Sequence, residues 1–440
     1  MSRIRTVTHE VREKVAREVA DWEATYENTH GRPPTADASS AWGEQAIVKA
    51  VEASGRAIMG RGESPLTENE EDLVIEAVRS HVFGHGPLDA LLKDPTLEEI
   101  MANGFDNVTL VRVGGRREPG PPLADSAREF EDTIRRLAAT AGKTERRFDD
   151  AQPYLDLRLP DGSRLHAIKQ VTNRLTVTIR RHGHTTMSLP ELVELGTITP
   201  ALSHFLQCAV APPLPCAVMV AGGTATGKTT FLRGLISCIP PDERLVVIED
   251  SSELSLELDP QRAKHCVEME VRQPNLEGVG GISMKALGEQ ALRMRPDRVI
   301  VGESRKGDEV RAVLNALNSG HEGSMSTIHA DSALSALSKM QTSALQGEDA
   351  LSMDASAQLI SLVLHLVVHI TKRPNGQRIV SSVREVTGAD GPRIETTEIF
   401  ALDEHGQLRA TQAGVSAELM ERLRASGFDH FSLLEGGNAA

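Results

Sequence analysis

Apolar side chains recur at helical spacing through the first 82 residues of the chain. The clearest run places them three or four positions apart with charged residues between them: Val11, Val15, Val19, Trp22 and Tyr26. A second helical segment is expected near 41–60. Thr67 and Glu70 have the spacing of a capping box that opens a third helix. Residues 1–82 are therefore predicted to be a helical N-terminal extension, either a bundle or an arm that docks on a partner.

Between residues 83 and 182 the pattern changes to short alternating strands beside one helix. The helix is expected near 126–141, and the strands are expected at 108–113, 155–159, 164–171 and 175–181. The turn Pro160-Asp161-Gly162 joins two of these strands as a hairpin. The segment 83–182 is predicted to be an α+β N-terminal domain with an antiparallel sheet, and residues 183–198 are predicted to be the linker that follows it.

From residue 199 onward, apolar strands alternate with helical stretches. The strands are expected at 216–221, 244–249, 297–302 and 323–329, and the helices at 228–238, 283–295, 307–318 and 332–345. Such alternation predicts right-handed crossovers and a mostly parallel sheet in an α/β domain that spans 199–402. A hairpin through Pro374-Asn375-Gly376 closes this domain, and residues 403–440 are expected to be a polar C-terminal tail that is helical in places.

Composition narrows the possible partners and the compartment. The 440 residues carry 62 acidic and 48 basic side chains, a net charge of −14, and only 3% are aromatic, so no nucleic-acid partner is expected. The four cysteines show no C-x-x-C pairing and are expected to be reduced core residues. The N-terminus has no apolar signal region, and the longest apolar stretch, Leu359–Ile370, is too short to cross a bilayer. We therefore expect a cytoplasmic protein.

A complete phosphate-loop motif follows the strand expected at 216–221. Glycines there let backbone N–H groups converge on phosphate oxygens, and the next helix presents its positive dipole end to the same anion. Lys228 is expected on the β- and γ-phosphates, and the Thr229 hydroxyl on Mg²⁺. The predicted ATP-binding residues are Gly222, Gly223, Thr224, Ala225, Thr226, Gly227, Lys228, Thr229 and Thr230. This Walker A context makes a chance Gly-Lys-Thr turn the weaker interpretation.

Polar side chains follow three of the later strands, at the sheet edge where open α/β sheets bind ligands. Glu249 and Asp250 end the strand at 244–249 and are predicted, with Thr229, to hold Mg²⁺ or its waters; a solvated turn and helix cap is the alternative, above all for Glu253. Glu303 ends the next strand and is predicted to orient the attacking water. His329 is placed to sense the γ-phosphate, although a lone histidine is more often structural.

Together these blocks resemble the ATPases of type II and type IV secretion and pilus systems, most closely the CpaF-type ATPases of tight-adherence (Flp) pili. The resemblance covers roughly residues 83–402. It matches Glu249, Asp250 and Glu253 to the family's aspartate box, Gly302-Glu303 to its atypical Walker B motif, and His321 to His329 to its histidine box. It implies a RecA-like P-loop ATPase domain behind the smaller α+β domain.

Four segments of the smaller domain also look like family signatures: Gly86-Pro-Leu-Asp-Ala-Leu-Leu, Glu99-Ile-Met-Ala-Asn-Gly, Leu159-Pro-Asp-Gly-Ser-Arg164 and Thr178-Ile-Arg180. The resemblance implies that Arg164 and Arg180 reach the nucleotide, and guanidinium forks suit the charge that develops on a transferring phosphoryl group. From the residues alone, surface pairing in a hairpin is the alternative, and Arg181 is the weaker candidate.

The loop departs from the family pattern at two positions, where Ala225 and Thr226 replace a glycine and a serine. Ala225 cannot comfortably adopt a positive φ, so we expect it to keep ordinary dihedral angles and to tune nucleotide affinity rather than abolish binding. Ser304 and Lys306 also depart from the family pattern, which bears on coupling to a partner more than on hydrolysis.

The resemblance implies an ATP-hydrolysing motor, with ATP and Mg²⁺, that assembles as a homo-oligomer, a hexameric ring, at the inner face of the cell membrane. It would act on an inner-membrane platform protein and drive assembly of an Flp pilus or protein secretion. A type IV secretion or conjugation ATPase shares the same motifs and is the first alternative. A nucleotide-gated scaffold without hydrolysis is the second, and a recombinase-like DNA motor, which conflicts with the net charge, is the third.

Overall fold

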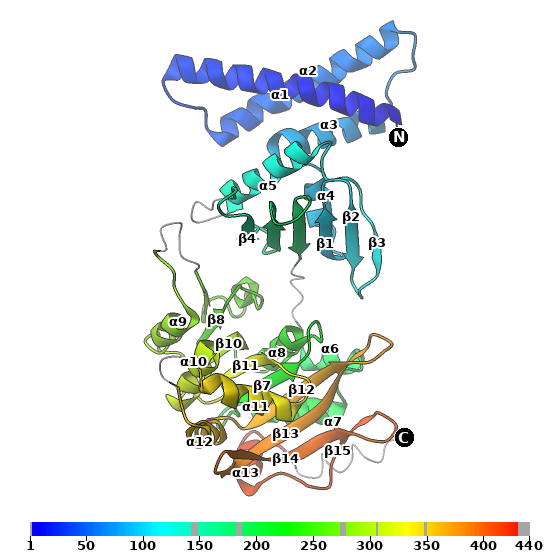
Figure 1. The fold of residues 1–440 in the computed structure, drawn as a ribbon. Coiled ribbons are helices and arrows are strands. Elements are labelled where there is room, and N and C mark those ends of the chain that lie inside the picture. Colours follow the sequence, from blue (N-terminus) through cyan, green and yellow to red (C-terminus); the bar gives the residue numbers. More distant parts are fainter. Residues whose placement is uncertain are drawn as a thin grey trace. The chain divides into compact units, whose positions relative to one another are not determined.

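The protein folds into two compact units, Met1–Gly183 and His184–Ala440. They are seen in a computed structural model, which describes residues 2–141, 148–181, 187–272, 279–304, 307–346 and 350–429 (Figure 1). Among the described helices, none combines the length and apolar character needed to span a lipid bilayer. The four cysteines Cys208, Cys216, Cys238 and Cys266 are free thiols, and three of them are buried.

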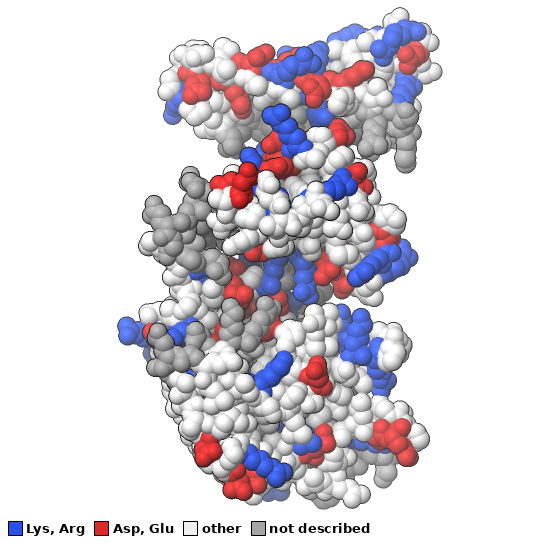
Figure 2. All heavy atoms as spheres, in the orientation of Figure 1, with Lys and Arg blue, Asp and Glu red and all other residues white. Residues whose placement is uncertain are grey.

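Three helices, α1 (Ser2–His30), α2 (Ala36–Gly60) and α3 (Glu68–Phe83), form a layer at the start of the first unit. Their apolar faces enclose a core of their own, in which Val15, Ile47 and Val74 are fully buried. The capping box of Thr67 and Glu70 is present as predicted. The helical periodicity therefore marks contacts of the helices with one another. Figure 2 shows blue and red side chains interspersed over the visible face of this layer.

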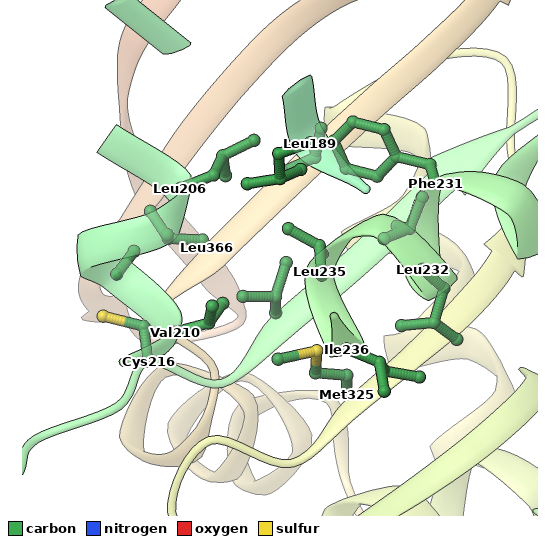
Figure 3. Packing of buried hydrophobic residues seen from close by; sticks show 14 of the residues in the cluster. Leu189, Leu206, Val210, Cys216, Phe231, Leu232, Leu235, Ile236, Met325 and Leu366 are labelled. Carbon is green, nitrogen blue, oxygen red and sulfur yellow. The ribbon is translucent and has the colours of Figure 1, made fainter. Parts of the chain in front are cut away.

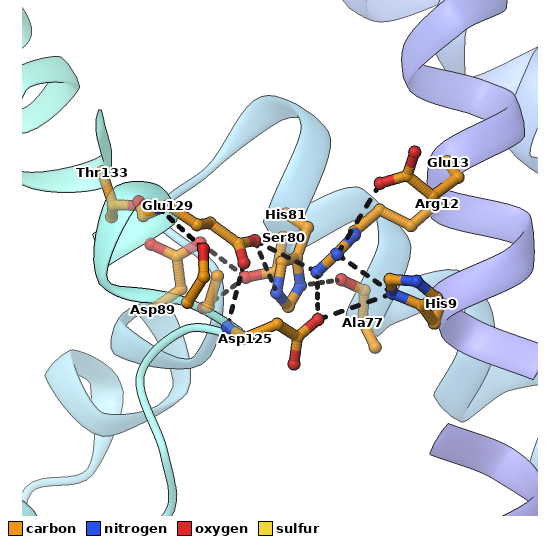
Figure 4. A network of polar contacts seen from close by, with 12 residues as sticks. His9, Arg12, Glu13, Ala77, Ser80, His81, Asp89, Asp125, Glu129 and Thr133 are labelled. Atoms are coloured by element: carbon orange, nitrogen blue, oxygen red, sulfur yellow. Dashed lines mark hydrogen bonds and ion pairs between the residues drawn. The ribbon is translucent and has the colours of Figure 1, made fainter. Parts of the chain in front are cut away.

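Polar contacts join this helical layer to the rest of the first unit (Figure 4). Arg12 of α1 reaches Asp125 at 2.9 Å and Glu129 at 3.1 Å, and its side chain is only 13% exposed. The carboxylate of Asp89 accepts hydrogen bonds from the Ser80 hydroxyl at 2.8 Å and from the backbone N–H of His85 at 2.9 Å. These contacts fix the extension to the α+β domain, so that the two segments 1–82 and 83–182 lie in one compact unit.

The α+β part of the first unit is a six-stranded antiparallel sheet in the order β3-β2-β1-β6-β5-β4. Its strands are β1 (Leu97–Asn103), β2 (Val108–Arg112), β3 (Arg117–Pro119), β4 (Tyr154–Arg158), β5 (Arg164–Ile168) and β6 (Thr176–Arg180). The helices α4 (Pro87–Lys93) and α5 (Ala127–Ala141) complete it. Leu88, Phe130 and Ile134 from these helices are fully buried with one face of the sheet. The predicted hairpin through Pro160-Asp161-Gly162 joins β4 to β5.

The second unit is built on a nine-stranded sheet in the order β15-β14-β13-β12-β7-β11-β10-β8-β9. The strands from β12 to β9 run parallel, and β12 to β15 form an antiparallel extension. The strands are β7 (Val218–Gly222), β8 (Leu245–Glu249), β9 (Cys266–Glu270), β10 (Arg298–Ser304), β11 (Met325–His329), β12 (Leu366–Lys372), β13 (Arg378–Asp390), β14 (Arg393–Leu402) and β15 (Leu408–Ala410). The helices are α6 (Leu189–Glu194), α7 (Pro200–Val210), α8 (Lys228–Ile236), α9 (Met284–Ala291), α10 (Gly307–Asn318), α11 (Ala333–Ala344), α12 (Met353–Val363) and α13 (Ala417–Ala425), with the 3₁₀ turn η1 (Leu256–Leu258). This is the predicted α/β class.

Helices cover both faces of this sheet, and the central strand β7 is therefore buried throughout. Val218 and Val220 point into the core that α7 and α8 cover, shown in part in Figure 3, whereas Met219 and Ala221 point into the other core. Such strands carry continuous apolar runs because each face has a hydrophobic neighbour. The apolar run at 216–221 therefore predicted β7 correctly.

Two boundaries differ from the sequence prediction. The second unit begins at His184, and α6 lies within the predicted linker 183–198, because Leu189 and Leu192 are buried in the core together with α7 and α8. The predicted tail 403–440 contains β15 and α13, and Leu423 on α13 is fully buried in the same core. Each segment contributes only a few core side chains, so that neither was assigned to the packed second domain.

Candidate nucleotide site

The phosphate loop links the C-terminal end of β7 to the first turn of α8. Gly227 is the residue before α8 and has a φ of +92°, a left-handed conformation that glycine adopts without strain. At Gly222 a Cβ atom would lie 2.6 Å from both the Ile370 carbonyl oxygen and the Thr226 hydroxyl oxygen. Glycine is thus required at one position by the backbone angle and at the other by the approach of β12.

Ala225 adopts a φ of +58°, contrary to the prediction that it would keep ordinary dihedral angles. The loop path demands a left-handed residue there, which explains the glycine that the family pattern has at this position. Thr226 supports the same path, because its hydroxyl donates to the Gly223 carbonyl at 3.0 Å and its side chain is 7% exposed. Thr224 is exposed, and Thr230 lies partly buried on α8.

Three charged or titratable side chains meet beside the loop. Lys228 Nζ donates to the Gly223 carbonyl at 3.0 Å and lies 3.8 Å from Glu303 Oε1 and 3.3 Å from His329 Nε2. His329 Nε2 lies 2.7 Å from Glu303 Oε1, so an Nε2–H would donate to this carboxylate. The strand register places His329 directly opposite Gly222. The structure thus gathers Lys228, Glu303 and His329, which lie far apart in the sequence, at one edge of the sheet.

An irregularity in β10 directs Glu303 toward this cluster. The register between β10 and β11 shifts between Val301 and Ser304, and such bulges re-aim side chains. The Thr327 hydroxyl donates to the Gly302 carbonyl at 2.7 Å, and the Ser304 and Ser326 hydroxyls lie 2.9 Å apart. Ser304 is therefore an interior side chain. Lys306, the other departure from the family pattern, lies outside the described residues together with Arg305.

Glu249 occupies a different place from the one predicted for a metal ligand. It is 3% exposed, and its carboxylate accepts hydrogen bonds from the backbone N–H groups of Glu253 at 3.0 Å and Leu254 at 3.2 Å. Burial raises the pKa of Glu249 to about 8, although these donors favour the anion. The side chain also crosses Gly302, where a Cβ would lie 2.7 Å from Glu249 Cγ and Oε1. Glu249 therefore holds the turn that follows β8.

This turn brings Glu253 to the phosphate loop. The Thr229 hydroxyl donates to Glu253 Oε2 at 2.7 Å, and Arg233 of α8 donates to the carbonyls of Glu253 and Leu254. Asp250 is exposed at the end of β8. The carboxylate beside Thr229 is thus that of Glu253. For this residue the sequence indicated a helix-capping role as readily as a role in the Mg²⁺ site. Arg233 was missed, although its position four residues after Thr229 places both on one face of α8.

Oxygen ligands are what Mg²⁺ prefers, and it commonly takes only one or two protein carboxylates beside phosphate oxygens and waters. The Thr229 and Glu253 oxygens fit this requirement at 2.7 Å from one another. Among the residues that the structure describes, no group of three or more His, Cys, Asp or Glu side chains is arranged to hold a metal ion. The residues present therefore fit a metal that arrives with a phosphate ligand.

The histidine box is divided between two edges of the sheet. His329 ends β11 at the phosphate-loop edge, whereas His321 precedes β11 and lies at the opposite edge. The Ser324 hydroxyl donates to the His321 carbonyl at 2.8 Å, and Glu322 pairs with Arg422 of α13 at 3.3 Å. Only the last residue of this box belongs to the candidate site, because β11 runs from one end of the box to the other.

In the first unit, Arg164 and Arg180 are directly paired across β5 and β6, and Arg158 of β4 pairs with Arg164 on the other side. Paired residues share one face of a sheet, so three guanidinium groups form a row there. Glu99 lies opposite Arg180, with 3.8 Å between Arg180 Nε and Glu99 Oε1. Arg181 lies apart from this row and donates to the Asp94 carbonyl, which is a structural contact.

Comparison with known proteins gives the family. The family model described as "Type II/IV secretion system protein" matches residues 82–426. The putative conjugal transfer protein Rv3659c of Mycobacterium tuberculosis is 32% identical over 338 residues, which cover 75% of this chain and 92% of that protein. The type IV secretion system protein VirB11 of Bartonella quintana is 29% identical over 356 residues, 72% of this chain and 96% of that protein.

Solved structures were matched as well. The VirB11 ATPase of the Brucella suis type IV secretion system has a TM-score of 0.36 at 26% identity, over 68% of this chain and 95% of that one. The Legionella pneumophila ATPase DotB has a TM-score of 0.49 at 17% identity, over 73% of this chain and 81% of that one. The family match spans most of both units and includes every residue of the candidate site. The chain therefore belongs to the type II/IV secretion system protein family.

Proposed function

We propose that the protein hydrolyses Mg·ATP at the phosphate loop. The observation that carries this proposal is the cluster of Lys228, Glu303 and His329, in which a carboxylate and a titratable ring lie within 4 Å of the phosphate-loop lysine. Glu303 would orient the attacking water, since its carboxylate lies 3.8 Å from Lys228 Nζ and 2.7 Å from His329 Nε2 at the loop edge. His329 would report the state of the γ-phosphate through its contact with Glu303.

The phosphates would be held by the backbone N–H groups between Gly222 and Thr230 and by Lys228, which would exchange the Gly223 carbonyl for a phosphate oxygen. Mg²⁺, when bound, would neutralise charge on the β- and γ-phosphate oxygens. Thr229 would hold it together with Glu253, which replaces Glu249 in our assignment, and Asp250 would order one of its waters. Glu249 would act through the turn that carries Glu253.

Arg164 and Arg180 are proposed to stabilise charge on the γ-phosphoryl group when the first unit closes over the nucleotide. Their cross-strand pairing supports a shared role, because directly paired residues project their side chains from the same face of the sheet. Closure of the first unit over bound nucleotide would then be the mechanical step. Equal distances between fluorescent labels on the two units with AMP-PNP, with ADP and without nucleotide would contradict this step.

At the level of the cell, we propose a homo-oligomeric ring, a hexamer, that works against an inner-membrane platform protein from the cytoplasmic side. One candidate process is assembly of a tight-adherence pilus, which the sequence resemblance favours. The other is type IV secretion or conjugation, which the similarity to the conjugal transfer protein and to VirB11 favours. Deletion in the host separates them: loss of surface pili with normal DNA transfer supports the first process, and the reverse supports the second.

The test of hydrolysis compares phosphate release by the wild-type protein and by Glu303→Gln, which keeps the side-chain shape but removes the carboxylate. Glu404→Gln is the matched control, because Glu404 is 86% exposed in a turn that lies between β14 and β15. We expect turnover in wild type and Glu404→Gln, and loss of about a hundredfold or more in Glu303→Gln. Equal turnover in all three proteins would refute the role of Glu303. Nucleotide binding without turnover in any of them would favour the scaffold alternative.

A further inference from the structure

Two cations lie opposite one another at the tip of the β12–β13 hairpin. Lys372 ends β12, Arg378 begins β13, and the register pairs them directly, so that their side chains share one face. Both side chains are exposed. The hairpin tip lies at the same sheet edge as the phosphate loop, because β12 runs parallel to β7 with Ile370 opposite Gly222.

Arg378 contacts the phosphate loop itself. A Cβ atom on Gly227 would lie 3.1 Å from Arg378 Cδ and 3.7 Å from Arg378 Nε. The guanidinium stem therefore lies against the loop residue that immediately precedes Lys228. A side chain larger than hydrogen on Gly227 would press on this stem, in addition to being strained by the φ of +92°.

The two side chains have no counter-charge among the described residues. Within that part of the chain, neither the Lys372 nor the Arg378 side chain forms a hydrogen bond or an ion pair. Like charges directly opposite each other in a sheet are destabilising, and an exposed pair beside a phosphate loop gains nothing from the protein to offset this. An anion bound at the loop would supply the missing charge.

The topology indicates which part of the anion lies there. Glu303 and His329 belong to β10 and β11, on one side of β7, whereas the hairpin follows β12 on the other side. The γ-phosphate must face Glu303, where the attacking water is activated in our proposal. Arg378 therefore approaches the nucleotide from the opposite side, where the α- and β-phosphates lie.

We propose that Arg378 is a nucleotide-binding residue that contacts the α- and β-phosphates, with Lys372 adding to the positive potential. This inference rests on the nucleotide site proposed above. ATP and ADP carry the same α- and β-phosphates, so Arg378 binds substrate and product alike. Interactions that are equal in the ground state and the transition state change KM and leave kcat unchanged. Arg378 thus sets nucleotide affinity, and Glu303 sets the rate.

The test measures binding of AMP-PNP, ADP and inorganic triphosphate, each with Mg²⁺, to wild type, Arg378→Ala, Arg378→Lys and Arg393→Ala. Arg393 is the matched control, since it is an exposed arginine that begins β14. The strand register places it opposite Asp390 at the far end of β13, about 40 Å along the strand from Arg378. We expect Arg378→Ala to weaken all three ligands by the same factor of about ten, the size of one charged hydrogen bond. Arg378→Lys should recover part of this loss, and Arg393→Ala should match wild type.

Three results would overturn the inference alone, with the proposed function left intact. The first is that Arg378→Ala binds all three ligands with wild-type affinity. The second is that Arg378→Ala loses affinity for ADP and AMP-PNP but binds triphosphate normally. The third is that Arg393→Ala loses as much nucleotide affinity as Arg378→Ala. A kcat that falls in Arg378→Ala at saturating ATP would also contradict it. A wild-type protein that binds none of the ligands would refute the nucleotide site as a whole. Thermal unfolding of each variant checks that the fold is retained.

Discussion

Replacement of Gly302 by alanine tests how β10 and the turn after β8 are coupled. The new Cβ would lie 2.7 Å from both Cγ and Oε1 of Glu249, closer than real Cβ contacts come. Glu249 is 3% exposed and cannot swing into solvent without loss of its two backbone hydrogen bonds. The substitution should therefore displace Glu249, release the turn that it holds and move Glu253 away from Thr229.

The magnitude follows from two contributions. Overpacking of a filled site costs about 1–3 kcal/mol. A buried N–H group that loses its acceptor, such as that of Leu254, costs about 1–3 kcal/mol more. We expect Gly302→Ala to lower the free energy of unfolding by about 2–6 kcal/mol in total. Gly388→Ala on β13 is the control, because its Cβ would meet only Glu395 Oε2, at 3.8 Å.

The assay is urea unfolding of a double-mutant cycle with Glu249→Ala, together with the Mg²⁺ dependence of AMP-PNP binding. In the Glu249→Ala background the clash is absent, so Gly302→Ala should cost at least about 1 kcal/mol less than in wild type. Gly302→Ala should also reduce the gain in AMP-PNP affinity that Mg²⁺ provides, since the Thr229–Glu253 contact is disturbed. Additive costs in the cycle, or an unchanged Mg²⁺ effect, would refute the coupling.

Three further substitutions have defined outcomes. Ala225→Gly relieves the strain of a left-handed alanine, which costs about 1–2 kcal/mol, but glycine adds conformational entropy to the unfolded chain. The net effect should be a stabilisation of up to about 1 kcal/mol, measured by thermal unfolding. A destabilised variant would contradict the φ of +58°. Arg298 is 1% exposed, and its guanidinium group donates to the Glu243 carboxylate at 2.6 and 2.9 Å. Glu243→Ala leaves this buried charge unpaired and should lower the free energy of unfolding in urea by about 3–5 kcal/mol. A decrease of less than about 1 kcal/mol would contradict this expectation. Burial lowers the pKa of His365 to about 4, and its Nδ1 accepts a hydrogen bond from the Ala217 N–H at 3.1 Å. The folded protein therefore disfavours protonation of this ring, so the free energy of unfolding should be highest above pH 6.5 and fall by up to about 3 kcal/mol as the pH drops through 4. His365→Asn keeps the acceptor without the titration and should remove this part of the pH dependence; an unchanged pH profile would assign it to other groups.

The parallel sheet and the phosphate loop could be predicted from the sequence because both leave strong local signals. The apolar run of β7 and the glycines that follow it are contiguous, so no tertiary knowledge is needed to connect them. The positions of Glu303 and His329 at the same edge follow from the rule that parallel strands end together. These parts of the candidate site depend on topology alone.

The contacts within the site could not be predicted, because they depend on how a turn is folded. The sequence favoured Glu249 over Glu253 as a metal ligand since Glu249 ends the strand, but burial against Gly302 turns its carboxylate to the backbone. The left-handed angle of Ala225 was likewise missed, because alanine carries no signal for it. Arg378 is separated from the loop by about 150 residues, and only the pairing of β12 with β7 brings it there.

The packing of α13 bears on which fragments can be produced as folded protein. Leu419, Leu423 and Phe428 are at most 4% exposed, and the Phe428 ring packs edge-on against Phe205 of α7 at 5.9 Å. Burial of three such side chains contributes about 5–9 kcal/mol, which is comparable to the whole stability of an ordinary domain. A recombinant second unit cut at 402, where the repeated strand–helix pattern ends, would expose this surface and aggregate. A second unit that retains residues up to 429 keeps these three side chains in the hydrophobic core.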